Sequence, residues 1–183
     1  MDIIKFLTTR QSNPLLTSPA PVSEQIEQIL TAGMRVPDHA GLTPWHFDVI
    51  SGKGLDKLSA IFGDAIIASG GDEAKVEKAK NMPYRAPLII VVSTRYQPHD
   101  KVPEIEQAVA AGCSVHAMQM AATALGYGAM WRTGAMSYDA NVKKALDIEA
   151  HNDIIGFLYI GTRQKQLPVK PSRAFAPHVS YLL

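Results

Sequence analysis

Residues 88–93 read Leu-Ile-Ile-Val-Val-Ser (LIIVVS), an apolar run that Pro87 precedes and that no charged side chain interrupts. Isoleucine and valine favour extended backbone, because their branched side chains pack well on a pleated surface. A strand without polar alternation is typical of a position that is covered on both faces. The run therefore predicts the central strand of a sheet that lies between two other layers.

The chain on both sides of this strand predicts several helices and further strands. Helical periodicity marks the helices, together with end signals such as Ser23, a good N-cap, and Pro37, which disfavours helix in the residue before it. We expect helices at 2–9, 24–35, 55–67, 72–82, 103–125 and 141–146, and strands at 47–51, 88–93, 127–131 and 153–160. Because this order lacks a regular βαβ alternation, it predicts an α+β sandwich.

The stretch 107–131 carries no formally charged side chain, and its length alone would permit a membrane span. Polar and glycine interruptions, and a content of Ala and Met in place of Leu and Ile, argue against a span. A helix that is apolar all round is expected to be buried on every side, in a large core or in a subunit interface. His116 and Gln119 are then expected to be hydrogen-bonded polar groups of the core.

The composition is that of one globular domain. The 183 residues are 46% hydrophobic and 19% charged, and the net charge of +1 offers no basic field to nucleic acid or to a membrane surface. Cys113 is the single cysteine, so we expect neither a disulfide within the chain nor a cysteine metal cluster. Because the first residues show no secretion signal, we expect a cytoplasmic protein.

The end of the chain contains Pro168, Pro171 and Pro177, which are incompatible with a long regular element. We therefore expect residues 163–183 to form an extended tail, long enough to wrap over a neighbour. One small sheet would not easily cover both this tail and the uncharged helix. Together they indicate a homodimer.

Common catalytic signatures are absent, since the chain contains no GxGxxG, GxxxxGK[ST], HExxH or GxSxG. Cationic and polar residues stand instead beside turns at three places. At the first place, the planar guanidinium group of Arg10 can donate two parallel hydrogen bonds to a phosphate, and Ser12 can donate one through its hydroxyl group. Arg10 could equally be a surface charge that complements the end of a helix.

The second place is 35–47, RVPDHAGLTPWHF, where prolines, a glycine, histidines and a tryptophan lie between a helix and a strand. Such loops build sites, although Trp45 could simply fill the core and Asp38 could cap a helix. The third place is 126–136, GYGAMWRTGAM, whose glycines either let a flat ligand approach the backbone or serve packing alone. The histidines show no shared metal-ligand spacing, so no metal site is expected.

Four segments, in their order and spacing, resemble the nitroreductase family, and in particular its smallest members, over residues 1–180. They are TRQSN (9–13), AGMRVPDHAGLTPWHF (32–47), AAGCSVHAMQMAATALGYGAMWRTGAM (110–136) and IIGFLYIGT (154–162). Many members have a second arginine where this chain has Gln11.

The resemblance implies a set of cofactor-binding residues. For FMN the set is Arg10, Gln11, Ser12, Arg35, His39, Trp131, Arg132 and Thr133. For the nicotinamide side of NADH or NADPH it is Ala121, Ala122, Thr123, Ala124, Leu125 and Gly126. The implied fold is an α-β-α sandwich whose mostly antiparallel sheet is flanked by helices. It belongs to a domain-sharing homodimer that holds FMN between its subunits, with residues 163–183 packing on the partner.

The implied activity is that of an FMN-dependent oxidoreductase, which uses NADH or NADPH to reduce nitroaromatic, quinone or related small electrophilic acceptors. This agrees with the missing catalytic motifs, because a flavin performs hydride transfer itself and the protein supplies binding and electrostatics. Two alternatives remain open. One is a flavin reductase or dehydrogenase that acts on a non-nitro substrate, and the other is a non-catalytic FMN-binding dimer.

Overall fold

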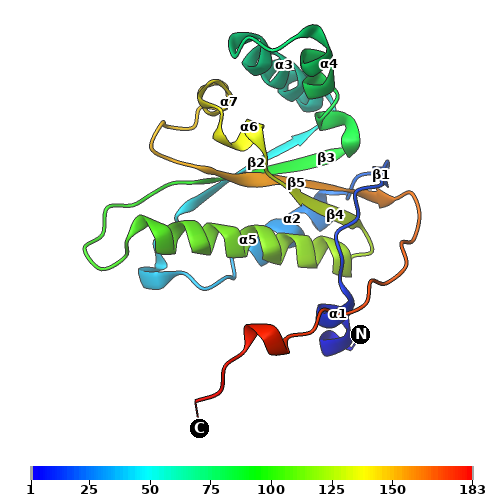
Figure 1. Ribbon diagram of the computed structural model, residues 1–183, viewed down its shortest axis with the longest axis vertical. Helices are drawn as coiled ribbons and strands as arrows, with labels where there is room; N and C mark the ends of the chain where they lie inside the picture. The colour runs from blue at the N-terminus through cyan, green and yellow to red at the C-terminus, as the bar shows by residue number, and fades with distance from the viewer. Residues whose placement is uncertain (1, 183) are drawn as a thin grey trace.

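The computed structural model describes residues 2–182, which form one five-stranded sheet with helices on both faces (Figure 1). Every pair of neighbouring strands is antiparallel. Across the sheet the order is β1 (Leu16–Thr17), β5 (Ile154–Arg163), β3 (Leu88–Thr94) and β2 (Trp45–Ser51), and β4 (Gly128–Arg132) also pairs with β5. The predicted α+β class with a mostly antiparallel sheet is confirmed.

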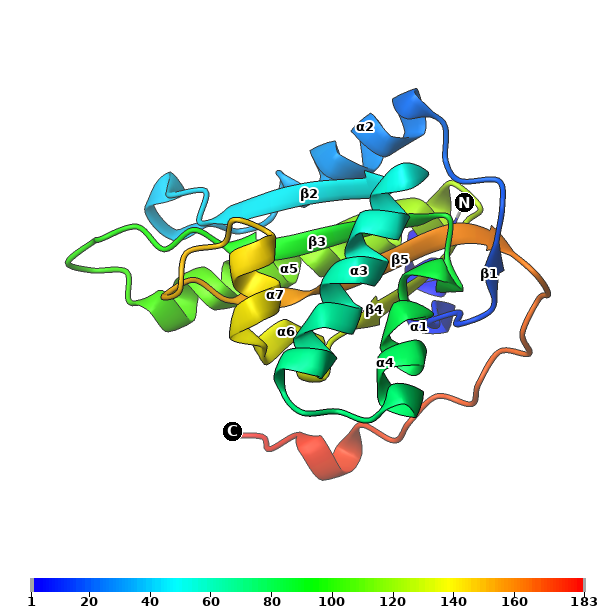
Figure 2. The same cartoon turned by 90° about the horizontal axis from the view of Figure 1, so that it is seen from above.

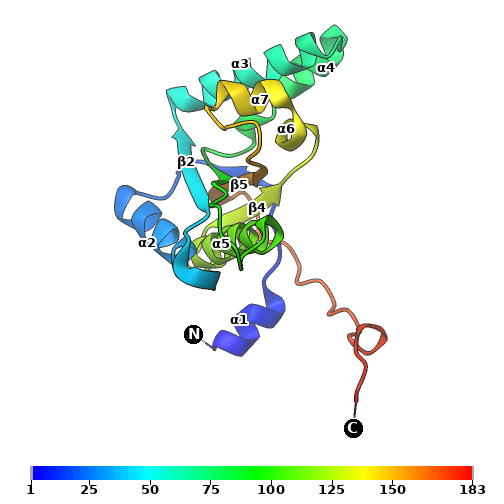
Figure 3. The ribbon, with the colours of Figure 1, turned by 90° about the vertical axis from the view of Figure 1, so that its left-hand side faces the viewer.

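Two helical layers enclose the sheet. Figure 2 shows one layer from above, formed by α3 (Lys53–Ala68), α4 (Glu73–Lys80), α6 (Ala135–Tyr138) and α7 (Ala140–Ala145). The opposite layer is formed by α2 (Ser23–Gly33) and α5 (Glu104–Ala124). In Figure 3, α1 (Ile3–Thr9) and the C-terminal tail project beyond the α5 layer. Short 3-10 turns complete the fold at His39–Gly41, Pro83–Arg85 and Ala176–His178.

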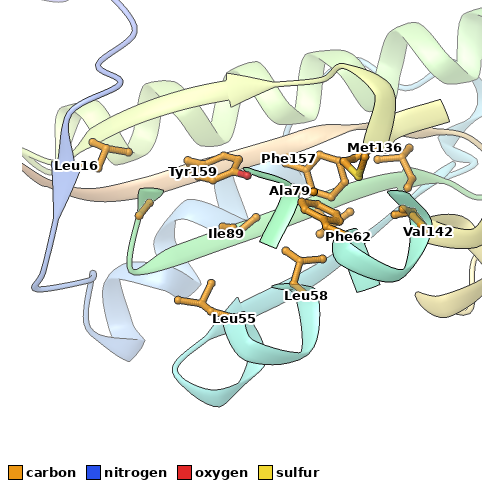
Figure 4. Packing of buried hydrophobic residues seen from close by; sticks show 14 residues of the cluster. Leu16, Leu55, Leu58, Phe62, Ala79, Ile89, Met136, Val142, Phe157 and Tyr159 are labelled. Atoms are coloured by element: carbon orange, nitrogen blue, oxygen red, sulfur yellow. The ribbon is translucent and has the colours of Figure 1, made fainter. Parts of the chain in front are cut away.

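Strand β3 is the buried centre of the molecule, and all its residues are buried. Ile89 and Val91 belong to the core on the α3 side, where Phe62 and Phe157 meet edge to face with ring centroids 5.3 Å apart (Figure 4). The alternate residues of β3 belong to the core on the α2 and α5 side. The prediction of a central strand covered on both faces is therefore confirmed.

Trp131 ties three elements together at the end of β4. Its indole N–H donates to the carbonyl of Ile155 at 3.1 Å, and its ring lies so close to Gly156 in β5 that an added Cβ there would overlap it. On α5, a Cβ added to Gly112 would meet the same ring at an ordinary 3.7 Å. The close packing of the Trp131 ring on Gly156 thus fixes the position of the end of β4 and of the residues that follow it.

Within a single chain, one face of helix α5 is open. Val109 in the uncharged stretch is 59% exposed, Ile105 just before this stretch is 69% exposed, and His116 is exposed as well, so His116 is not a core group of its own chain. Burial of this face in a subunit interface, the other expectation for the helix, stays a prediction. Gln119 is buried as expected, and its amide donates to the carbonyl of Ala129 at 3.4 Å. An uncharged sequence does not distinguish a face that the chain's own sheet covers from a face that stays open.

Among the helices of residues 2–182, none is long and apolar enough to cross a membrane.

The start of α2 differs in detail from the prediction. Val22 is its N-cap, and Ser23 is the first helical residue. The side chain of Gln25 accepts a hydrogen bond from the backbone N–H of Val22 at 3.1 Å, which satisfies a donor at the helix start. The two-residue β1 and the short α6 carry too few residues for periodicity to reveal them.

We predict that Gly156→Ala lowers the free energy of unfolding by roughly 1 to 3 kcal/mol, because the added methyl group would overlap the Trp131 ring and because L side chains rarely adopt the φ of 155° at this position. Gly112→Ala is the matched control, since it meets the same ring at an ordinary distance and lies in a helix, where alanine is favoured by roughly 0.5 to 1 kcal/mol. Urea unfolding of both variants measures the difference. Equal free energies of unfolding for the two variants would contradict the proposed packing of Trp131 on Gly156.

Candidate functional site

The first site element is a cleft at the end of α1, called here the Arg10 cleft. Arg10 is the C-cap of α1, and its backbone N–H donates to the carbonyl of Phe6 at 2.9 Å. The cleft has a volume of about 280 Å³ and lies between this helix end, Thr123 of α5 and the beginning of the C-terminal tail. Three segments far apart in the sequence therefore meet at one place.

The Arg10 cleft is cationic. Arg10 and Arg163 both line it, and none of the lining residues that the structure describes is acidic. The guanidinium of Arg163 is held by the carbonyls of Tyr127 and Thr123, at 3.1 and 3.5 Å. The Nη1 atom of Arg10 is buried and has no hydrogen-bond partner among the described residues. A buried guanidinium nitrogen without a partner is costly, so this cleft suits an anionic ligand such as a phosphate.

Gln11 joins the tail to the end of α1. Its amide nitrogen donates to the carbonyl of Pro168 at 2.8 Å, and its amide oxygen accepts from the backbone N–H of Lys170 at 3.1 Å. Where many family members carry a second arginine, this chain thus has a side chain that holds its own tail beside Arg10. The Ser12 oxygen accepts from the Gln119 amide at 3.4 Å, which leaves the hydroxyl proton of Ser12 free for a ligand.

The segment 121–126 forms the end of α5 and reaches the Arg10 cleft at one residue. Thr123 lines the cleft, and its hydroxyl donates to the carbonyl of Gln119 at 2.8 Å. Ala122 is fully buried in the core, whereas Ala124 and Gly126 are exposed. Contact between this segment and a transient ligand would therefore be made by its exposed residues and not by Ala122.

Trp131, Arg132 and Thr133 lie at the end of β4, outside the Arg10 cleft. Because successive residues of a strand point to opposite faces, Trp131 belongs to the α5 side, whereas Arg132 stacks on the Tyr159 ring on the α3 side, with its guanidinium carbon 5.4 Å from the ring centroid. All three residues nevertheless line one cavity at the end of β4, and Thr133 is exposed there.

His39 lies close to the start of α5, and Arg35 is exposed in the turn that follows α2. The His39 ring nitrogen Nδ1 is 2.8 Å from a carboxylate oxygen of Glu106, and both side chains are largely exposed. Asp38 holds the loop by accepting the backbone N–H of Thr43 at 2.7 Å. Trp45 is buried against Ala110 and Ala111. The interpretation of Trp45 as a core residue is therefore confirmed. Asp38 precedes the 3-10 turn His39–Gly41, but its side chain makes no capping hydrogen bond there and holds Thr43 instead.

The Arg10 cleft and the His39 loop lie at opposite ends of α5. Glu106, which contacts His39, and Thr123, which lines the Arg10 cleft, are 17 residues apart, and a rise of 1.5 Å per residue separates them by about 26 Å. A mononucleotide is too short to contact both within one chain. Within a single chain, the Arg10 cleft and the His39 loop are thus too far apart to bind the same FMN molecule.

A sequence model described as the nitroreductase family matches residues 8–162. The chain belongs to this family. It is 47% identical over 164 residues to a protein of Escherichia coli K12 named "Putative NAD(P)H nitroreductase YdjA", and the matched region covers 90% of each chain. The resemblance to the nitroreductase family that the four sequence segments indicated is therefore confirmed.

Two solved structures show the same fold. A nitroreductase-like family protein from Bacillus cereus superposes with a TM-score of 0.85 at 22% identity, covering 100% of this chain and 96% of its own. A nitroreductase with bound FMN from Bacteroides fragilis superposes with a TM-score of 0.76 at 18% identity, covering 100% of both chains. These nitroreductase-family chains share the α-β-α architecture described above.

Sequence reasoning missed Arg163, which lines the Arg10 cleft, and Arg85 and Tyr159, which surround Arg132. Arg163 and Tyr159 lie in β5, within or next to a segment that is otherwise apolar. A cation at the end of an apolar strand was a usable signal for Arg163. Arg85 stands in a short 3-10 turn, where no local pattern marks it.

Proposed function

We propose that this chain is an FMN-dependent oxidoreductase that takes electrons from NADH or NADPH and reduces nitroaromatic, quinone or related small electrophilic acceptors. The observation that carries the proposal is the buried, unpartnered Arg10 nitrogen in a cleft with a second arginine and no acid. In a nitroreductase-family chain, this arrangement fits the phosphate of FMN. The NAD(P)H named for the E. coli relative and the FMN bound in the B. fragilis structure support the same cofactors.

The residues around the Arg10 cleft fit a phosphate in charge and in hydrogen bonding. Arg10 supplies a charge-assisted donor and Arg163 a second cation. Ser12 is not among the residues that line the cleft, but it lies two residues after Arg10 and its hydroxyl proton is free. Gln11 keeps the tail in place beside them. FMN, when bound, supplies the hydride and electron chemistry, so the chain needs no nucleophile of its own.

The end of β4 is suited to the flavin ring in our proposal. Thr133 is exposed at the backbone edge, and Gly134 follows with a positive φ of 97°, so unblocked backbone N–H groups there are open to a flat ligand. Donors aimed at a ring that becomes anionic on reduction would stabilise the reduced form. The packing of the Trp131 ring against Gly156 fixes the position of this edge.

We further propose a homodimer that builds each flavin site from both chains. The open face of α5 presents Ile105 and Val109, and the tail presents Phe175 and Tyr181, which are 70% and 74% exposed. Apolar surface of this kind is typical of a protein interface. Two α5 helices that pack antiparallel would bring the His39 loop of one chain to the Arg10 cleft of the other. Residues 163–170 bind to their own chain through Gln11 and Asn13, and the more distal tail would pack on the partner.

The proposal is tested by the visible spectrum of the purified protein and by its turnover. We expect a yellow protein that contains FMN and oxidises NADH or NADPH when a nitroaromatic or a quinone is added. Bound FMN without turnover would support the non-catalytic flavin-binding alternative. Turnover that needs added free flavin, and reduces no nitro compound, would support a flavin reductase. A protein that retains FAD, or no flavin, would contradict the FMN assignment.

We predict that Arg10→Ala weakens FMN binding about tenfold to a hundredfold, because a hydrogen bond to a charged group contributes roughly 1.5 to 3 kcal/mol. Equilibrium dialysis of FMN against the folded variant measures the effect. Lys5→Ala is the matched control, since it removes an exposed cation from the same helix outside the cleft. If Arg10→Ala retains FMN as the wild type does, Arg10 is not a phosphate ligand.

The shared site predicts complementation between two deficient variants. Arg10→Ala and His39→Ala homodimers should each bind FMN poorly. In a mixed dimer one site carries both substitutions, while the other combines native Arg10 from one chain with native His39 from the other. About one FMN site per mixed dimer should therefore return after subunit exchange. If exchange is demonstrated with folded, deficient parents and no binding returns, each chain builds its own site.

A further inference from the structure

A second cationic cavity lies on the α3 side of the sheet, away from the Arg10 cleft. It has a volume of about 390 Å³ and is lined by the end of β4, by β5, and by the 3-10 turn Pro83–Arg85. Arg85 and Arg132 both line it, and so does Tyr159. We call it the Arg85 cavity. None of the described residues around it is acidic.

The two arginines of this cavity are not neutralised by the chain. The Nε atom of Arg132 is buried and has no hydrogen-bond partner among the described residues. Burial, and then the charge of Arg85, lower the pKa of Arg132, while the guanidinium stays over the Tyr159 ring. Two cations brought together in a partly buried hollow repel each other, and this repulsion opposes folding unless an anion compensates it. The unpaired buried donor therefore indicates a place for a negatively charged group.

The remainder of the cavity wall is apolar. Phe62, Phe157 and Met136 line it and lie together on this side of the sheet in Figure 4. Met82 and Met130 complete the apolar part, and methionine adapts to ligands of varied shape. Sites for small molecules have this composition, a mostly apolar wall with a few polar groups that fix the orientation. The ligand is thus expected to join an apolar body to one anionic group.

The cavity borders the part of the chain that we propose for the flavin ring. Trp131, Thr133 and Gly134 line it together with Arg132. A molecule held by Arg85 and Arg132 would therefore lie next to the backbone edge of β4. Arg10 and Arg163 belong to a different cleft, so the phosphate of FMN does not account for the charge of the Arg85 cavity.

We propose that the Arg85 cavity binds the carboxylate of a small aromatic acceptor, with Arg85 and Arg132 as its cationic partners. This inference rests on the proposed oxidoreductase function and specifies its substrate class, an aromatic carboxylic acid with a reducible group. The guanidinium fork matches a carboxylate in geometry as well as in charge. Uncharged acceptors of equal size lack this contact.

The first test compares 4-nitrobenzoate with its uncharged methyl ester as acceptors. Arg85→Gln should raise the KM for 4-nitrobenzoate about tenfold to a hundredfold, the range for loss of one charge-assisted contact, and should leave the KM for the ester within about twofold. Arg85→Glu should weaken 4-nitrobenzoate further, since the new carboxylate would pair with Arg132. Arg95→Gln is the matched control, because Arg95 is exposed and lies outside the cavity. Equal changes for acid and ester, or no change for either, would overturn the proposal.

The second test needs no turnover and separates this inference from the proposed function. Calorimetric titration of the purified protein with benzoate should show binding that weakens in Arg85→Gln, remains in Arg95→Gln, and decreases with added salt. If no acceptor is reduced but benzoate binds in this pattern, the oxidoreductase proposal fails and the anion site stands. Benzoate binding that is absent, or equal in wild type and Arg85→Gln, overturns the cavity assignment. A change of oligomeric state in Arg85→Gln without a change in benzoate affinity would assign the arginines to a partner's carboxylate, and would overturn it too.

Discussion

The burial of β3 on both faces is the constraint on which the rest of the structure depends. A strand with no polar face requires cover on each side, and its backbone groups require a partner strand along each edge, which β2 and β5 provide. The two helical layers follow from this requirement. The same division separates the two cationic sites, because the Arg10 cleft lies at the end of α5, whereas the Arg85 cavity lies under the α3 layer.

Uncompensated positive charge is the common property of these two sites. In each, two arginines line a hollow without an acid among the described residues, and one guanidinium nitrogen is buried without a partner. A protein that needed only stability would have no use for such groups, because an unpaired buried donor lowers the free energy of unfolding. Anionic ligands are the simplest explanation. A phosphate at the end of α1 and a carboxylate beside β4 would place a flavin and its acceptor along one strand edge.

The length of α5 explains why one chain does not complete the proposed flavin site. The helix places the His39 loop and the Arg10 cleft at its two ends, and it leaves an apolar face open between them. A second copy of the chain would cover that face and join the two groups of residues. Association and cofactor binding would then depend on the same helix, so that loss of the dimer would also remove the flavin site.

The sequence by itself determined the elements whose pattern is local and repeated. LIIVVS specified a strand buried on both faces, the pattern of residues 103–125 specified a long helix, and Arg10 with Ser12 already suggested a phosphate. Only the tertiary structure decided which charges meet. Arg163 reaches Arg10, and Arg85 reaches Arg132, across separations that no periodicity encodes. It also decided that Gln11 holds the tail and that one face of α5 stays exposed. The pattern of hydrophobic and polar side chains along a segment indicates which of its faces are buried. A binding site depends instead on the distances between segments, and these distances are set by the packing of the whole chain.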